Sequence, residues 1–284
     1  MDDNNRYVNG LVKTDDVFYF PLGWQHSFQG IDPDVGCTLL LWFDNQDGAG
    51  SINLSDIMAA YPERIKRASL NGIPGEAMLS WPVKTNAIGS GTIQDEKITP
   101  SSNPQNLWPV FPVSQGKVSD SGEGGAEYAV RQEQLLAQLT MSGARIELQA
   151  GAMRELHWHT NADELHYVLS GKVRNIVHGN LGEPEEYLIE AGDIGYVPKQ
   201  FVHYLEAVDG PATVIVCFNH PNWGTQGLSA MMAVTPTYIT SATLNTTVEV
   251  ADTYFPKESE AFLKVTPKIE DPNAVPNSGS DPGY

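Results

Sequence analysis

Short segments in which apolar and polar residues alternate dominate the chain between residues 137 and 218. A period of two places every second side chain on one face, as in a half-buried β-strand. Glycines separate these segments at positions that suit turns. The strand-like runs are 137–141, 144–148, 165–169, 173–177, 186–189, 194–197 and 212–218. Many short strands at this spacing predict an antiparallel sandwich or barrel.

Helical patterns are few, and the best candidates are residues 54–71, 228–234 and 246–263. Residues 74–125 are rich in Gly, Pro, Ser and Asn, a composition typical of a long connecting loop. The chain after Thr266 contains several prolines, which predicts an irregular or wrapping segment.

An internal repeat relates the N-terminal region to the predicted barrel. Residues 16–26 align without a gap on residues 193–203 and share Asp, Tyr, Pro and His at the same four places. An apolar run that predicts a strand follows each copy, at 37–43 and at 213–218. The strands upstream of the second copy have no counterpart upstream of the first, so the first copy corresponds to the back half of a unit. Its open strand edges need a cover, and we expect packing on the complete unit or association as a homo-oligomer.

Four side chains form the strongest candidate for a chemical site. His157 and His159 lie two positions apart, so on a strand both imidazoles point to one face. Glu164 follows across a sequence suited to a turn, which brings a carboxylate back beside them. His203 comes from a later strand that a barrel would turn into the same interior. Three imidazoles and one carboxylate suit a divalent ion of Mn, Fe, Co, Ni, Cu or Zn.

A His-x-His pair alone is more often a surface or core pair than a metal site. Here the spacing to Glu164 adds a second, independent signal. Glycines at 151 and 171 and the downstream element 192–203, with Gly-Asp, Pro and His in order, add a third. Agreement among separate parts favours the metal site.

Two further residues are candidates for a catalytic role. Arg154 lies three positions before His157, so perfect alternation points it to the opposite face. A role in the site needs a bulge or a strand end, and a surface arginine fits the local pattern as well. His166 shares the parity of Glu164, and either a contact with that ligand or a hydrogen-bonded core position explains it. His26 has no His-x-His partner, and a structural role fits it best.

Two segments carry a family resemblance. Residues 151–171 resemble the first motif of the cupins, and residues 192–203 resemble the second. More narrowly, Met-Arg-Glu-Leu-His-Trp-His at 153–159 with Asn-Ala-Asp-Glu at 161–164 is similar to the second domain of the bicupin oxalate decarboxylase and oxidase family. The motifs are long and specific.

The resemblance implies an all-β cupin, a double-stranded β-helix or jelly-roll barrel with a few peripheral helices. It covers most of residues 10–71 and of the predicted barrel. We therefore expect residues 1–73 to form a partial cupin, equivalent to its C-terminal half, together with a helix. Residues 74–126 are expected to form linking or wrapping loops. A complete metal-binding barrel at 127–236 and a C-terminal helix with an irregular tail at 237–284 follow.

The resemblance also implies a chemistry. The four candidate ligands would bind Mn²⁺, and Arg154 would bind the carboxylate of a substrate, with dioxygen taking part. The expected function is an oxalate decarboxylase-like or oxalate oxidase-like enzyme acting on oxalate or a related small carboxylate. His166 is a further catalytic candidate. The same ligands accept Fe, Co, Cu, Ni or Zn.

The sequence departs from the family pattern at its loops. The decarboxylases use a carboxylic acid on a mobile lid to protonate the product, yet residues 219–229 contain no Asp or Glu. A strand position with Glu in the family aligns with Val216. The corresponding loop of the first copy, 44–51, is short and lacks the family's Ser-Glu-Asn-Ser type motif. We expect peroxide rather than formate. Trp223 and the altered loop support a cupin dioxygenase or isomerase as an alternative, and a non-catalytic storage protein is a third reading.

Composition narrows the partners. The formal net charge of −18 disfavours nucleic acid and anionic membranes, which reward clustered Lys and Arg. No run approaches the roughly 20 apolar residues of a membrane helix. The polar, acidic N-terminus lacks a secretory signal, so the chain as written is expected in the cytoplasm, or secreted if its N-terminus is incomplete. Cys37 and Cys217 lie in apolar runs, which favours buried thiols over a disulfide.

Overall fold

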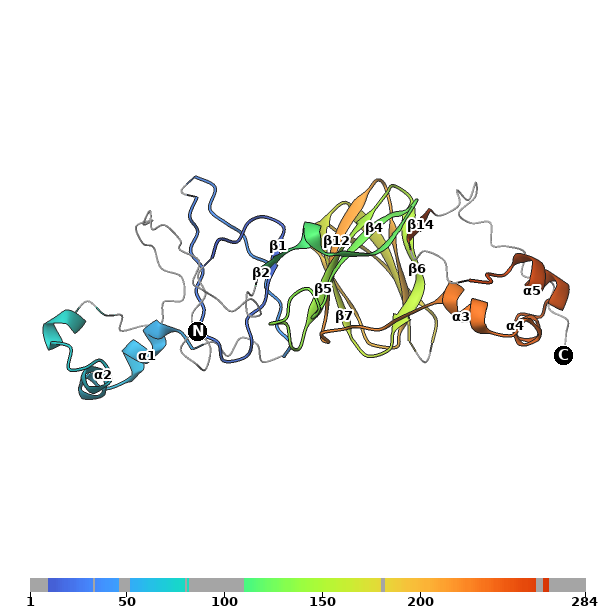
Figure 1. Ribbon diagram of the computed structural model, residues 1–284. Helices are drawn as coiled ribbons and strands as arrows, with labels where there is room; N and C mark the ends of the chain where they lie inside the picture. The colour runs from blue at the N-terminus through green and yellow to red at the C-terminus, as the bar shows by residue number, and fades with distance from the viewer. Residues whose placement is uncertain are drawn as a thin grey trace. The chain divides into compact units, whose positions relative to one another are not determined.

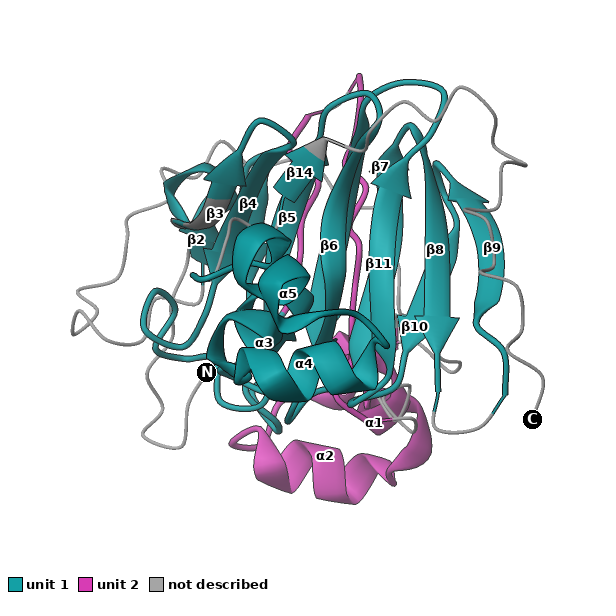
Figure 2. Cartoon of the chain, turned by 90° about the vertical axis from the view of Figure 1, so that its right-hand side faces the viewer, with its two compact units in different colours: residues 1–26, 99–284 teal, residues 27–98 magenta. Residues whose placement is uncertain are grey.

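A computed structural model describes residues 10–32, 34–45, 52–79, 81, 110–179, 182–258 and 263–265 of the chain. The chain divides into two compact units, of which the first comprises Met1–His26 and Thr99–Tyr284 and the second comprises Ser27–Ile98 (Figure 2).

Two antiparallel sheets form the barrel of the first unit. The order of one sheet is β10-β7-β12-β5-β4-β3. Its strands are β3 (Lys117–Gly122), β4 (Gly125–Val130), β5 (Ser142–Leu148), β7 (Glu164–Ser170), β10 (Ile194–Val197) and β12 (Ala212–Phe218). The order of the other is β13-β6-β11-β8-β9, with β14 also paired to β6. Its strands are β6 (Ala152–His159), β8 (Lys172–His178), β9 (Glu185–Glu190), β11 (Val202–Ala207), β13 (Thr225–Gly227) and β14 (Leu263–Val265).

The two sheets face each other in Figure 1, and alternation along most of their strands places the core side chains between them. In β5 every second residue is buried, including Ile146 and Leu148, and β12 buries Val214 and Phe218 in the same way. Val214 lies opposite Ile146 in the ladder. Burial of each large apolar side chain contributes about 1.5–3 kcal/mol. The barrel predicted from this alternation is confirmed, although the run predicted as a strand at 137–141 forms turns and bends, and β5 begins only at Ser142.

The turn between β7 and β8 depends on Gly171. Its φ of +79° is disfavoured for residues with a Cβ, and a Cβ built there would collide with the carbonyl oxygen of Pro211 and with Ala212. Glycine therefore permits the close approach of two turns at this end of the barrel.

Short helices follow the barrel. They are α3 (Leu228–Val234), α4 (Thr237–Thr243) and α5 (Val248–Tyr254). In Figure 2 these helices lie in front of the sheet that contains β6. The first matches its prediction, whereas the helix predicted over 246–263 ends at Tyr254. Pro256 cannot continue a helix, and residues 263–265 form β14 instead. No helix in the described residues is long and apolar enough to cross a membrane.

The barrel is larger than the range 127–236 predicted for it. β3 precedes that range and β14 follows it, and both contribute strand pairs. β2 (Val110–Pro112), from the predicted linker, pairs with β1 (Asp16–Phe18), and the 3-10 helix η2 (Val113–Gln115) follows it. Backbone pairing across distant segments decides these boundaries, which composition could not indicate. The expected tail beyond 266 lies outside the described residues.

The second unit contains α1 (Leu54–Ala60), α2 (Glu63–Ser69) and the 3-10 helix η1 (Gly75–Met78). The helix predicted over 54–71 is broken, because Pro62 follows an extended Tyr61 with φ −94° and ψ 146°.

The strand predicted at 37–43 is not formed, since these residues carry no strand hydrogen bonds among the described residues. Phe43 is 59% exposed, and Cys37, expected to be buried, is also exposed. No strand among the described residues pairs with this run, and a strand needs such a neighbour to form. That residues 1–73 are a partial cupin remains a prediction.

Candidate metal centre

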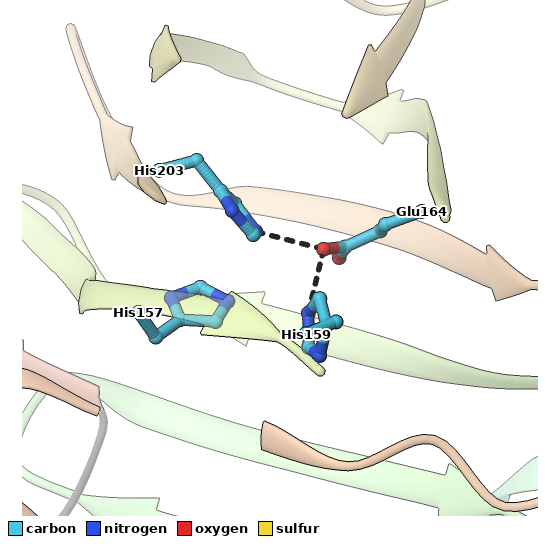
Figure 3. A group of neighbouring side chains, drawn as sticks. All are labelled: His157, His159, Glu164 and His203. Carbon is cyan, nitrogen blue, oxygen red and sulfur yellow. Dashed lines mark hydrogen bonds and ion pairs between the residues drawn. The ribbon is translucent and has the colours of Figure 1, made fainter. Parts of the chain in front are cut away.

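Four side chains converge inside the barrel (Figure 3). One ligand atom from each of His157, His159, Glu164 and His203 lies within 4.8 Å of the others. All four side chains are buried, with at most 2% of any residue exposed. This is the one group of its kind among the described residues, and it unites the four ligands that the sequence predicted.

The strands place these residues by register and alternation. β6 and β11 pair so that His203 lies opposite His157. His159 follows two positions later on β6, where alternation returns it to the same face. A turn then leads into β7, whose first residue is Glu164. Figure 3 shows the carboxylate and the imidazoles facing one another.

Side-chain amides hold this turn against the loop that follows β12. Asn161 Oδ1 accepts the backbone N–H of Gly224 at 2.7 Å, and Asn161 Nδ2 donates to the carbonyl oxygen of Asn222 at 3.1 Å. The backbone N–H of Asp163 donates to Asn219 Oδ1 at 2.8 Å, while Asn219 Nδ2 donates to Asp163 Oδ2 at 2.7 Å. These bonds fasten the loop to the segment that joins the ligand strands.

Backbone carbonyls orient the imidazoles. Nδ1 of His157 and Nδ1 of His203 each lie within 2.9 Å of the carbonyl oxygen two residues earlier. Nδ1 of His159 lies 3.1 Å from the carbonyl oxygen of Gly224. A carbonyl oxygen only accepts hydrogen bonds, so each Nδ1 carries a proton, and in the neutral form of such an imidazole Nε2 presents its lone pair. Outer partners of this kind fix the orientation of metal-binding histidines.

Burial and charge set the protonation states. Burial lowers the pKa of His157 well below its usual value, and the positive charge of Arg154 lowers it further. Burial also lowers the pKa of His159 despite the attraction of Glu164. Burial alone would raise the pKa of Glu164, but His166 and His159 outweigh it and hold that pKa well below its usual range. Neutral imidazoles and an ionised carboxylate are the forms that bind transition metals.

The donor set fits a divalent transition-metal ion. Glu164 Oε2 lies 2.8 Å from Nε2 of His159 and 2.8 Å from Nε2 of His203. Lone pairs on these nitrogens that face an anionic oxygen suit a cation shared between them. Three imidazole nitrogens and one carboxylate oxygen suit Mn, Fe, Co, Ni, Cu or Zn and leave coordination positions open for a ligand.

A β-bulge turns Arg154 into the barrel. The pairing of β11 with β6 shifts between His203 and Leu205, where Leu205 lies opposite Arg154. Arg154 is 4% exposed, and its Nε donates to Oε2 of the buried Glu127 at 2.8 Å. Perfect alternation would have pointed Arg154 to the face opposite His157. The bulge is the irregularity that an inward-facing Arg154 was expected to need.

His166 supports a ligand from behind. It is fully buried, and its Nε2 lies 3.0 Å from Glu164 Oε1. Asn175 Nδ2 lies 3.3 Å from His166 Nδ1 and 3.1 Å from the hydroxyl of Tyr187. Because the amide nitrogen only donates, Nδ1 accepts and Nε2–H donates to the carboxylate. The structure thus brings His166 into contact with Glu164, one of the two placements that the sequence analysis left open.

Aromatic side chains close the barrel beside His159. The ring of Phe218 lies 4.8 Å from that imidazole, edge to face, and stacks on Trp223 at 4.3 Å. The guanidinium of Arg131 lies 3.4 Å from the centre of the Trp223 ring and donates to the Trp223 carbonyl at 2.6 Å. Trp223 is 3% exposed, so the loop after β12 is packed down at this point.

The sequence prediction missed Glu127 and Arg131. Glu127 shares the parity of the buried Ala129 on β4, so alternation could have indicated that it faces the interior. Arg131 follows the end of β4, and no local signal relates it to Trp223.

His26 repeats one feature of His203. Its Nδ1 lies 2.9 Å from the carbonyl oxygen of Trp24, again two residues earlier, and its ring stacks on Phe20 at 4.4 Å. The ring is exposed, and the structural role expected of His26 remains a prediction.

Comparison with known proteins identifies the family. A family model described as cupin matches residues 114–252. Oxalate decarboxylase OxdC of Bacillus subtilis (strain 168) is 30% identical over 273 residues, which cover 93% of this chain and 69% of that protein. The chain belongs to the oxalate decarboxylase family. Both the cupin fold and the family predicted from the two motifs are therefore confirmed.

Other relatives and structures agree with this family. A probable oxalate decarboxylase of Arthroderma benhamiae is 27% identical over 84% of this chain and 60% of that protein. Germin-like protein 2-4 of Oryza sativa subsp. japonica is 34% identical over 37% of this chain and 47% of its own length. A solved structure of Bacillus subtilis oxalate decarboxylase, a protein with Mn(II) centres, superposes with a TM-score of 0.66 at 25% identity. That match covers 78% of this chain and 60% of the other, so this chain spans about two thirds or less of most of these decarboxylases.

Proposed function

We propose that this member of the oxalate decarboxylase family is a Mn²⁺-dependent enzyme that acts on oxalate or a related small carboxylate. The observation that carries the proposal is the buried guanidinium of Arg154 on β6, the strand that also carries the candidate ligands His157 and His159. Arg154 is close enough to lower the pKa of both His157 and His159, after burial. A cation there suits an anionic substrate held next to a metal. Relatives named oxalate decarboxylases and the Mn(II) centres of the Bacillus subtilis protein support substrate and metal.

Each residue has a defined task in this scheme. A bound Mn²⁺ would supply Lewis-acid and one-electron chemistry. Arg154 neutralises a substrate carboxylate and fixes its position. Phe218 and Trp223 exclude water from the side of the site next to His159, which strengthens those charge interactions. His166 holds Glu164 in its orientation.

The loop after β12 favours oxidation over formate production. Residues 219–229 contain no carboxylic acid, and both oxygens of the nearby Asp163 already accept hydrogen bonds, from Lys199 N–H and from Asn219. Without a positioned acid, protonation of the one-carbon product is slow. Oxalate then loses two electrons to give two molecules of carbon dioxide, and dioxygen takes up those electrons with two protons to give hydrogen peroxide.

Metal analysis combined with turnover assays tests this function. Purified protein loaded with Mn²⁺ is given oxalate in an oxygen electrode, and formate and peroxide are both measured. We expect oxalate-dependent oxygen consumption and more peroxide than formate. Formate as the main product would show that another group donates the proton. Bound metal with no reaction of oxalate would overturn the proposal.

The apolar side of the site favours one alternative. Phe218 and Trp223 stack next to His159, which suits a larger, less polar substrate of a cupin dioxygenase or isomerase. This alternative would be supported if oxalate caused no oxygen consumption in that assay while apolar carboxylates did. Metal that raises the unfolding temperature without any turnover would indicate a storage protein.

A further inference from the structure

A second carboxylate lies inside the barrel, apart from the metal ligands. Glu127 is on β4, opposite Ile146 of β5 in the ladder, and is 3% exposed. An isolated buried carboxylate would be strongly destabilising, so its contact with Arg154 is essential. Nε of Arg154 donates to its Oε2 at 2.8 Å, with side-chain exposures of 4% and 5%. The two groups form a buried ion pair.

The ion pair couples Glu127 to the metal-binding side of the barrel. Arg154 acts on His157 and His159 by charge, and it shares β6 with both. Glu127 also acts by charge on the half-buried Arg131, which stacks on Trp223. Its negative charge is therefore one side chain away from any carboxylate that Arg154 binds.

We propose that Glu127 determines the charge specificity of this site, by holding Arg154 through its Nε edge and by repelling doubly charged ligands more than singly charged ones. Glu127 then lowers the affinity of the site for dianions, such as oxalate at neutral pH, more than it lowers the affinity for singly charged carboxylates such as glycolate. The inference takes one element from the proposed function, namely that Arg154 binds the carboxylate of the ligand.

The physical basis is the proportionality of Coulomb energy to ligand charge. A fixed negative charge raises the energy of a dianion by twice as much as that of a monoanion at the same place. The low dielectric of the buried site keeps this repulsion from being screened by water and salt. Removing the charge should therefore raise the affinity for a dianion by about the square of the factor for a monoanion.

Glu127→Gln isolates the charge. The glutamine keeps an oxygen that can accept from Arg154 Nε, so the guanidinium stays in place while the negative charge is lost. Glu127→Asp keeps the charge and serves as the conservative variant, and Glu127→Met provides a second neutral side chain of similar volume. The matched control is Glu147→Gln on β5, which removes the same charge from a side chain 42% exposed and paired with Arg145.

The experiment measures binding of oxalate and glycolate to Mn²⁺-loaded protein at neutral pH without oxygen, by calorimetry and by the Mn(II) electron paramagnetic resonance signal. Retained metal is determined after each titration, because oxalate also chelates free Mn²⁺. We expect Glu127→Gln and Glu127→Met to raise oxalate affinity roughly tenfold and glycolate affinity roughly threefold. Glu127→Asp and Glu147→Gln should keep the wild-type ratio of the two affinities.

The outcomes separate this inference from the proposed function. If a folded, metal-loaded neutral variant changes both affinities by the same factor, or neither, Glu127 does not set charge specificity, even if the enzyme oxidises oxalate. If the ratio shifts as expected while oxalate is never turned over, the inference stands and the proposed reaction fails. Absence of binding of both ligands to the wild-type protein would overturn both.

Discussion

At the scale of single residues, the metal ligands give the most direct prediction. Replacing His157 or His159 with Ala removes one of four donors, and the remaining set cannot hold a divalent ion tightly. We expect about one metal ion per wild-type chain and a loss of affinity of more than roughly 100-fold in either variant, measured by mass spectrometry of the metal after dialysis. His178→Ala, at an exposed position, is the control. Full occupancy in both ligand variants would disprove the assignment.

Arg154 gives a second prediction at this scale. Arg154→Ala leaves a substrate carboxylate without its cation in a partly dry site, so kcat/KM for oxalate should fall by roughly 10²-fold or more. The same change leaves Glu127 buried without that partner and should destabilise the fold by about 3–5 kcal/mol. Unfolding must therefore be followed alongside the rate.

Arg145→Ala is the matched control for that variant, because Arg145 binds Asp15 and Glu147 away from the metal-binding group. A wild-type rate in a folded Arg154→Ala variant would show that Arg154 does not bind the substrate.

Residue patterns alone predicted the ligands but not all of the site. His157 and His159 follow from strand alternation, and Glu164 and His203 from the motifs that place them. Arg154 could not be placed, because the bulge that turns it inward depends on pairing with Leu205 of another strand. Strand parity could have placed Glu127 in the interior, but not its pairing with Arg154, which lies 27 positions away.

At the scale of elements, the turn between β7 and β8 can be tested through Gly171. Gly171→Ala would adopt a left-handed conformation and also collide with backbone atoms of the neighbouring turn. Gly182 has a positive φ of +109° but no atom within 4 Å of an added Cβ. We expect Gly171→Ala to lower the free energy of unfolding by at least about 2 kcal/mol more than Gly182→Ala does. Equal effects in urea unfolding would mean that the close contact is relieved without strain.

The elements also show where sequence patterns stop being informative. Alternation located the barrel strands because a buried core enforces it, as at Ile146 and Val214. The run at 37–43 has the same apolar character, yet it forms no strand, because strand formation requires partners as well as propensity. The helix predicted over 54–71 is interrupted at Pro62. The prediction gave more weight to the apolar pattern than to this proline.

At the scale of the whole molecule, the buried ligands make the stability of the metal-free protein depend on pH. The native pKa values of His157 and His159 lie below the unfolded value of 6.5, so below about pH 6.5 the unfolded chain binds protons that the native protein does not. Stability is therefore lost as pH falls, by up to about 1.4 kcal/mol per pH unit for each histidine. Glu164, whose native pKa is also lowered, adds a further loss below about pH 4.5.

Chelator-treated protein should thus unfold at a lower denaturant concentration at pH 5.5 than at pH 7.5. Bound metal should increase this dependence, since protons compete with it for the same nitrogens. The double variant His157→Gln, His159→Gln removes the two titrating groups, so its metal-free stability should change much less over this range. If wild type and double variant show the same slope, the histidines are not the groups that couple folding to pH.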